Sequence, residues 1–276
     1  MMAVRLGVMR IARFTIDDSI RYAFVQRDSQ DGLDYLVELD GFPFGAEPVQ
    51  PTGKRYGLDH EGLRLLAPVI PSKVLGLAKN YEAHAQWMAG DPSAHAPEEM
   101  VIFSKPSTAV IGPDDPIVLP SFSHDLNFEP EVAVVIGRVT KNVSEADAMK
   151  HVLGFTCVND VTLRDLQGSD PMWTRAKGFD TSCPLGPWIQ TELDYADAKI
   201  SFILNGKNVD KASGSTKNLV HSIPSQIAFI SSFMTLLPGD VILTGTPDAS
   251  GSLKPGDEAI VHVEGIGDLR NVVVQG

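Results

Sequence analysis

Two glutamates, Glu129 and Glu131, stand two residues apart at the start of the segment NFEPEVAVVIG, residues 127–137. If this segment is a β-strand, both carboxylates project from the same face, because successive side chains of a strand alternate. Every residue from Val132 to Ile136 is apolar, which is typical of a strand buried on both faces. A buried pair of carboxylates needs a cation or a shared proton, since an unpaired buried charge is costly.

A third carboxylate, Asp160, ends residues 153–159, a run that we also expect to be a strand. Three carboxylate oxygens are ligands that Mg²⁺ or Mn²⁺ prefers, and they leave coordination positions open for a substrate. The seven histidines are scattered, and neither Cys157 nor Cys183 lies in a C-x-x-C pair, so zinc spacing is absent. The sequence therefore predicts a site for Mg²⁺ or Mn²⁺.

Short strands and a few helices must position these groups. Strands are expected at 11–14, 20–25 and 35–39, which makes residues 1–70 a small β-rich N-terminal domain that ends in a packed connector at 63–71. In residues 71–276 strands dominate, and 240–244 is one of them. Helices are expected at 80–89 before Gly90, at 144–153 with Ser144 and Asp147 as a capping-box variant, and at 224–237 after Pro224. The fold class is mainly β with α+β elements.

Composition excludes several classes of protein. The chain has 276 residues, 43% of them hydrophobic, and 23 Lys and Arg against 35 Asp and Glu give a net charge of −12. Such a surface repels nucleic acids and anionic membranes, so we expect neither as a partner. No apolar stretch has the length of a membrane span. The two cysteines fit reduced thiols, and a cytoplasmic location follows.

Several ordered motifs make the chain resemble the fumarylacetoacetate hydrolase family over residues 72–276. They are KNYxxH at 79–84, FxKPS at 103–107, ExE at 129–131, NDVTxRDxQ at 159–167, WxxAKGFD at 173–180 and PGDxIxTGTP at 238–247. The resemblance implies a mixed β-roll and a homodimer. It also makes Glu129, Glu131 and Asp160 the metal ligands, and Lys177 the residue that stabilises a developing oxyanion.

The same resemblance assigns further residues to the site. Thr246 corresponds to a residue that binds the substrate carboxylate, although a simple strand-ending turn is an equal alternative, and Gly245 would let the ligand approach the backbone. Arg164 and Gln167 correspond to pocket residues, with a helix-surface role as the alternative. His84 corresponds to a histidine that activates water or shuttles a proton. It belongs to a predicted lid, residues 80–97, that we expect to become ordered when ligand binds.

One position departs from the family pattern. Hydrolases of the acylpyruvate type carry a Glu three residues after the lid histidine, whereas this sequence has Trp87. Without that carboxylate the imidazole lacks an orienting partner, and water activation is weakened. Glu82, Glu98 and Glu99 are the nearby candidates to replace it. Decarboxylation and keto-enol isomerisation only relocate a proton, so they tolerate the loss better.

Three hypotheses follow for the function. The first is a metal-dependent hydrolase that cleaves a carbon-carbon bond in an acylpyruvate-like or fumarylacetoacetate-like 2-oxo acid through a metal-stabilised enolate. The second is a decarboxylase or isomerase of a related dicarboxylate, such as oxaloacetate or 2-hydroxyhepta-2,4-diene-1,7-dioate. The third is a metal-bound ligand sensor or structural dimer without turnover. In the first two cases the partner is a small 2-oxo acid.

Overall fold

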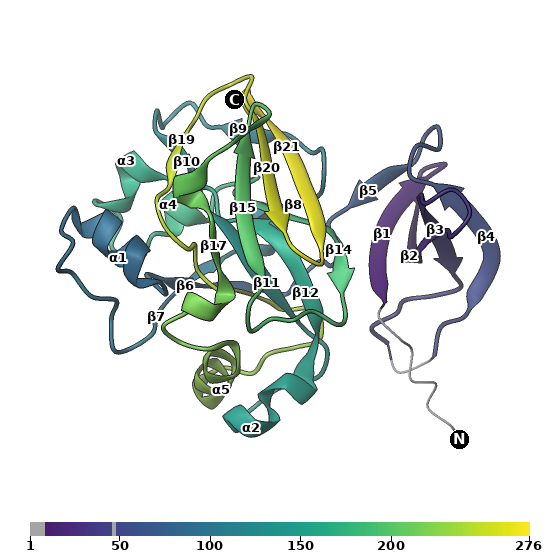
Figure 1. Cartoon of the computed structure of the whole chain (residues 1–276), viewed down its shortest axis with the longest axis horizontal. Coiled ribbons are helices and arrows are strands. Elements are labelled where there is room, and N and C mark those ends of the chain that lie inside the picture. Colours follow the sequence, from purple (N-terminus) through teal and green to yellow (C-terminus); the bar gives the residue numbers. More distant parts are fainter. Residues whose placement is uncertain (1–8, 46–47) are drawn as a thin grey trace.

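A twelve-stranded sheet runs through the molecule and joins its two parts (Figure 1). The computed structural model describes residues 9–45 and 48–276. Ten strands follow one another across this sheet, in the order β4 (Pro51–Gly57), β3 (Asp34–Leu39), β2 (Ser19–Arg27), β1 (Arg10–Ile16), β14 (Cys183–Gln190), β12 (Val152–Asn159), β11 (Pro130–Ile136), β18 (Val241–Leu243), β6 (Val74–Ala78) and β7 (Val101–Lys105). Two short strands lie off this path, since β5 (Arg64–Leu66) pairs with β1 and β8 (Val110–Ile111) pairs with β14.

The N-terminal strands form a lobe beside the main body (Figure 1). β1 continues the sheet of the main body, because Arg10 and Ile11 pair antiparallel with Gln190 and Ile189 of β14. Two strands of this N-terminal lobe differ from the sequence predictions. β4 was not expected, since its sequence PTGKRYG is largely exposed and shows no apolar alternation. β5 lies inside the predicted connector. The domain boundary near residue 70 stays a prediction.

A second sheet, of six strands, packs on the large sheet within the main body. Its path is β16 (Lys207–Asn208), β15 (Lys199–Leu204), β20 (Glu258–Val263), β21 (Gly267–Gln275) and β9 (Ile117–Leu119), with β17 (Gly214–Ser215) paired to β15. Strand β11 is buried at every position, as its sequence predicts. Val132, Val134 and Ile136 join the larger apolar core with Phe202 of β15, whereas Ala133 and Val135 join a second core on the opposite face.

A small three-stranded sheet and two short helices complete the region around the carboxylates. The sheet has the order β13 (Thr162–Leu163), β10 (Leu126–Phe128) and β19 (Gly251–Leu253). The helices are α3 (Arg164–Gln167) and α4 (Thr174–Lys177). In the part of the chain that the structure describes, four turns of 3₁₀-helix occur, namely η1 (Ser107–Ala109), η2 (Met149–His151), η3 (Asp210–Ala212) and η4 (Thr216–Asn218).

The other three helices test the sequence predictions. α1 (Glu82–Ala89) ends at Gly90, which takes the expected left-handed conformation with φ of 64°. α2 (Glu145–Ala148) begins after Ser144 as expected but is shorter than predicted, because residues 149–151 continue as η2 and Val152 begins β12. α5 (Ile223–Phe233) is capped by Ser222 and ends before the predicted residue 237, since Leu236 forms an isolated antiparallel bridge with Thr140.

The mainly β fold class is confirmed by these sheets. Within residues 9–45 and 48–276, no helix combines the length and the apolar character needed to traverse a lipid bilayer. The thiols of Cys157 and Cys183 are buried and free of disulfide bonds, which agrees with the reduced state expected from the sequence.

Candidate active site

Three carboxylates meet where β11 and β12 run side by side. Glu129 lies at the junction of β10 and β11, Glu131 lies within β11, and Asp160 directly follows β12. The pairing of Pro130 with Asn159 aligns the two segments, and the Asp160 N–H donates to the Glu129 carbonyl at 2.8 Å. All three side chains are buried, and one oxygen from each lies within 4.8 Å of the others. The structure therefore brings the three predicted ligands together.

Two cations neutralise part of this negative charge. Lys177, at the end of α4, places its Nζ 2.6 Å from Glu129 Oε2 and 2.5 Å from Asp160 Oδ2. Arg164 places Nη2 2.6 Å from Glu129 Oε1. Burial alone raises the pKa of Glu129, but the charges of Lys177 and Arg164 outweigh it and hold that pKa far below its usual value. The pKa of Lys177 is raised by Asp160 and Glu129 despite its burial. Lys177 therefore stays charged.

Glu131 has no cationic partner among the described residues. Its Oε2 accepts one hydrogen bond, from the Gly245 N–H at 2.6 Å. Burial, together with the charges of Asp160 and Glu129, raises its pKa well above the usual value. Glu129, Glu131 and Asp160, which we call the acidic triad, thus lack enough positive charge around them. Either a proton on Glu131 or a divalent cation supplies the missing charge.

Lys105 lies beside Asp160, whose carboxylate is the second of the triad that lacks a full set of partners. This buried lysine donates to the carbonyls of Val161, Lys177 and Ser182 at 3.1, 2.6 and 2.8 Å. Its Nζ also lies 2.8 Å from Asp160 Oδ1. This contact is an ion pair that lacks the geometry of a hydrogen bond, and Asp160 Oδ1 has no hydrogen-bond donor among the residues that the structure describes. A buried carboxylate oxygen without a donor fits a metal ion.

His84 projects from α1 with one fixed tautomer. Its Nδ1 lies 2.6 Å from the Asp248 carbonyl oxygen. A carbonyl only accepts, so Nδ1 carries the proton and Nε2 of the neutral ring keeps its lone pair. Burial is the main cause that lowers the pKa of His84, which keeps the imidazole neutral at physiological pH.

Trp87 occupies the position of the missing glutamate. Its indole stacks on the His84 ring with centroids 5.6 Å apart and planes 24° apart. The Arg164 guanidinium lies over the same indole at 5.4 Å. Glu82, one candidate replacement for the glutamate, instead accepts a hydrogen bond from the Ala96 N–H at 2.9 Å. The Asp248 carbonyl takes over the orientation of His84, but a carbonyl adds no negative charge.

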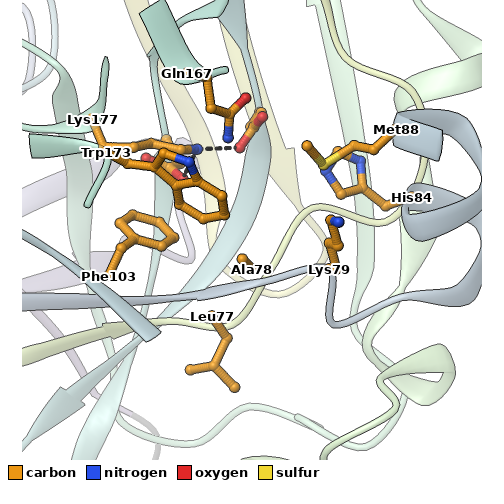
Figure 2. A pocket seen from close by; sticks show the side chains of 11 residues that line it. Leu77, Ala78, Lys79, His84, Met88, Phe103, Gln167, Trp173 and Lys177 are labelled. Carbon is orange, nitrogen blue, oxygen red and sulfur yellow. Dashed lines mark hydrogen bonds and ion pairs between the residues drawn. The ribbon is translucent and has the colours of Figure 1, made fainter. Parts of the chain in front are cut away.

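Glu129, Asp160, His84 and Lys177 line one pocket, and Glu131 is not among its lining residues. Figure 2 shows this pocket. His84 and Met88 of α1 form one wall, and Phe103 and Trp173 form the opposite one, beside Lys177. Residues 77–79, at the end of β6, complete the wall. The free space is about 10 Å³, roughly the room for a single water molecule. A substrate of several atoms needs more room than this, so side chains around the pocket must move when it binds, and the role of residues 80–97 as a lid stays a prediction.

The predicted substrate residues take different places. Gln167 lines the pocket, and Arg164 contacts both Gln167, at 2.5 Å, and Glu129. Gly245 contacts Glu131, as described above. The Thr246 hydroxyl donates to the Pro130 carbonyl at 3.2 Å and does not line the pocket. Their roles in binding substrate stay predictions.

Four features of the site were missed by the sequence analysis. They are the Lys105 ion pair, the Asp248 carbonyl, the aromatic wall of Phe103 and Trp173, and Lys79 in the pocket. The motifs at 79–84, 103–107 and 173–180 contained all these side chains. Lys105 carried the clearest signal, because it ends the mostly apolar strand VIFSK, and a lysine is rarely buried without a partner.

Two family models match the chain. Residues 73–274 match the C-terminal domain of fumarylacetoacetate (FAA) hydrolase. Residues 9–68 match the Rv2993c-like N-terminal domain. Together these matches span nearly all of the described residues.

Relatives of known structure or name extend these matches. The crystal structure of a 2-hydroxyhepta-2,4-diene-1,7-dioate isomerase from Mycobacterium marinum is 41% identical, with a TM-score of 0.85 over 97% of this chain and 98% of that chain. Human mitochondrial oxaloacetate tautomerase FAHD2A is 40% identical over 79% of this chain and 71% of its own length. A fumarylpyruvate hydrolase from Pseudomonas aeruginosa, in complex with Mn²⁺ and pyruvate, is 28% identical, with a TM-score of 0.69 over 77% and 92% of the two chains.

Proposed function

The chain belongs to the fumarylacetoacetate hydrolase family, and on that basis we propose that it is a divalent-metal-dependent tautomerase or isomerase of a small 2-oxo acid. The enzyme would move a proton between the carbon next to the keto group and the keto oxygen. One observation carries this choice of reaction. His84 is a neutral, buried imidazole oriented by the Asp248 carbonyl, with Trp87 where a hydrolase of the family would have a glutamate.

Glu129, Glu131 and Asp160 would hold Mg²⁺ or Mn²⁺. When bound, this ion supplies a Lewis acid for the carboxylate and keto oxygens of the substrate. The unpaired Glu131 carboxylate and the donor-free Asp160 Oδ1 support a cation at this place. The Mn²⁺ and pyruvate in the P. aeruginosa relative support the same pairing of ion and substrate class.

The protein's own groups supply the proton transfer. The His84 Nε2 lone pair accepts a proton from the substrate carbon, because its lowered pKa keeps the ring unprotonated. Lys177, held charged by Glu129 and Asp160, donates a hydrogen bond to the oxygen that gains negative charge. His84 then delivers this proton to the keto oxygen, which completes the enol and leaves the imidazole neutral again. Tautomerisation needs no further reactant.

Hydrolysis is the second candidate, and it was the first expectation from the sequence. It requires an attacking water with a base strong enough to deprotonate it, and the orienting partner of that base is normally a carboxylate. Here His84 contacts a carbonyl and an indole instead. The names of two relatives, an isomerase and a tautomerase, agree with this geometry. Decarboxylation remains an alternative outcome of the same enolate.

The proposal is tested with oxaloacetate in the presence of Mg²⁺ or Mn²⁺. Ultraviolet absorbance follows the enol, and NMR in D₂O follows deuterium at the reacting carbon and identifies the products. We expect rapid keto-enol exchange with all four carbons retained, and loss of that exchange in EDTA and in the His84→Ala variant. Products that lose carbon dioxide, or diketo acid substrates cleaved faster than they tautomerise, would replace the proposal with one of the alternatives.

A matched control separates catalysis from metal or buffer effects. Lys207→Met changes an exposed lysine of the β15–β16 hairpin, and it should keep the wild-type rate. If no 2-oxo acid in a panel is converted by the wild type but several still bind, the ligand-sensor hypothesis replaces the enzyme. The homodimer and the cytoplasmic location are also proposals, and sedimentation analysis tests the first.

A further inference from the structure

Lys79 directly follows β6 and directly precedes the predicted lid, residues 80–97. Its backbone is left-handed, with φ of 55°, a conformation that costs energy for residues other than glycine. The side chain lines the same pocket as His84 and Lys177. Figure 2 shows Lys79 between Ala78 and His84, on the opposite side of the pocket from Lys177.

Asn80 holds this unusual conformation in place. Its amide donates to the Thr244 and His221 carbonyls at 2.8 and 3.2 Å, and its Oδ1 accepts from the His221 N–H at 2.8 Å. Gly245 makes room for Asn80, because a Cβ added to Gly245 would lie 2.9 Å from the Asn80 Cβ. A strained residue that its surroundings fix this firmly is often part of a binding site.

Lys79 differs from the other cations of the site in having no carboxylate partner. Lys105, Lys177 and Arg164 each form an ion pair with Glu129 or Asp160. Among the residues that the structure describes, none forms an ion pair with Lys79. Leu77, Ala78 and Met88 line the same pocket, and His84, which Figure 2 shows beside Lys79, carries no negative charge. A partly buried cation beside apolar walls is complementary to an anionic group of a ligand.

We propose that Lys79 binds the second carboxylate of the substrate, so that the pocket selects 2-oxo dicarboxylates over 2-oxo monocarboxylates. This inference rests on the proposed function, which places the 2-oxo acid end at Glu129, Glu131 and Asp160. Lys177 already serves that end. Lys79, on the other side of the pocket, is the free cation for the far end, and a monocarboxylate would leave it unpaired.

The second carboxylate of oxaloacetate is bonded to the carbon that loses the proton, so an ion pair with it acts in the ground state and in the transition state. Its loss therefore lowers kcat/KM, and the rise in KM reports the part that acts in substrate binding. Lys79→Met removes the charge and keeps the length of the side chain. We expect KM for oxaloacetate to rise about 10- to 100-fold, as for loss of a hydrogen bond to a charged group.

Pyruvate provides the discriminating substrate, because it has no second carboxylate. Deuterium exchange of its methyl group should be as fast in Lys79→Met as in the wild type. Lys79→Arg should keep most of the oxaloacetate affinity, and Lys207→Met is the matched control. Equal losses for pyruvate and oxaloacetate, or no loss for either, would overturn the role of Lys79.

Calorimetric titration with Mg²⁺ present measures binding even if turnover fails. Tighter binding of oxaloacetate than of pyruvate by the wild type, abolished in Lys79→Met, would support the inference and place the failure in the proposed reaction. Unchanged oxaloacetate binding in a folded Lys79→Met protein would refute it. The thermal midpoint of each variant shows whether it is folded.

Discussion

We expect the Glu131→Gln substitution to lower the stability of the metal-bound protein and to leave that of the metal-free protein nearly unchanged. One carboxylate oxygen from each of Glu129, Glu131 and Asp160 lies within 4.8 Å of those of the other two. At an effective dielectric constant of about 20, two unit charges at that distance repel by about 3.5 kcal/mol. Glu131 faces two such charges and has a single N–H donor, whereas Lys177 bridges the other two carboxylates. Glu131 is therefore the member of the triad that most needs the cation.

Without divalent ions, glutamine replaces a side chain that is held neutral by its raised pKa. We therefore expect the thermal midpoint of Glu131→Gln in EDTA to equal or slightly exceed that of the wild type. With Mg²⁺ at a hundred times its dissociation constant, the wild type should gain about 2.7 kcal/mol. That gain corresponds to a rise of roughly 5 to 10 °C, and Glu131→Gln should lose most of it.

Differential scanning calorimetry over a series of Mg²⁺ and Mn²⁺ concentrations measures both effects. Glu61→Gln makes the same chemical change at an exposed residue of the N-terminal lobe, and it should respond to metal like the wild type. The reasoning is refuted if the wild type gains no stability from either ion, or if Glu131→Gln retains the full rise. A large loss of stability for Glu131→Gln in EDTA would also refute it.

Three further predictions concern residues around the triad. Because burial lowers the pKa of His84, the acid limb of the pH profile of kcat/KM should lie below pH 6.5, where the imidazole gains its proton and activity is lost; a limb above 6.5 would contradict this. Lys105→Met removes the buried partner of Asp160 and three donors, so urea unfolding in EDTA should show a loss of about 3 to 5 kcal/mol, and a loss below about 1 kcal/mol would show that the ion pair matters little. Trp87→Glu restores a carboxylate three residues after His84, and ¹⁸O incorporation from labelled water into the products of an acylpyruvate should rise relative to tautomerisation; an unchanged ratio would show that Trp87 does not decide the reaction.

Several elements were predictable because their signals are local. The unbroken apolar run of β11 indicated burial on both faces, and the structure places its side chains in two separate cores. Gly90 ended α1 as expected. β4 was not predictable, since its residues are exposed and it is held by backbone pairing with β3. The pattern at Ser144 marked the start of α2 correctly, although the Ser144 hydroxyl donates to the Asp147 carboxylate and accepts from no backbone N–H. Its end was not predictable, because residues from 152 onward pair in β12.

The sequence by itself determined which chemical groups are present. It also determined that the candidate metal ligands are carboxylate oxygens, which hard divalent cations prefer. The spacing of Glu129 and Glu131, and the apolar runs before Asp160 and after Glu131, are local properties of two strands. Tertiary structure alone decided how those groups are charged and oriented. Arg164 reaches Glu129 across 35 residues, and Asp248 orients His84 across 164. A backbone carbonyl has no signature in a sequence, and a pKa depends on neighbours that only the folded chain brings within a few ångströms.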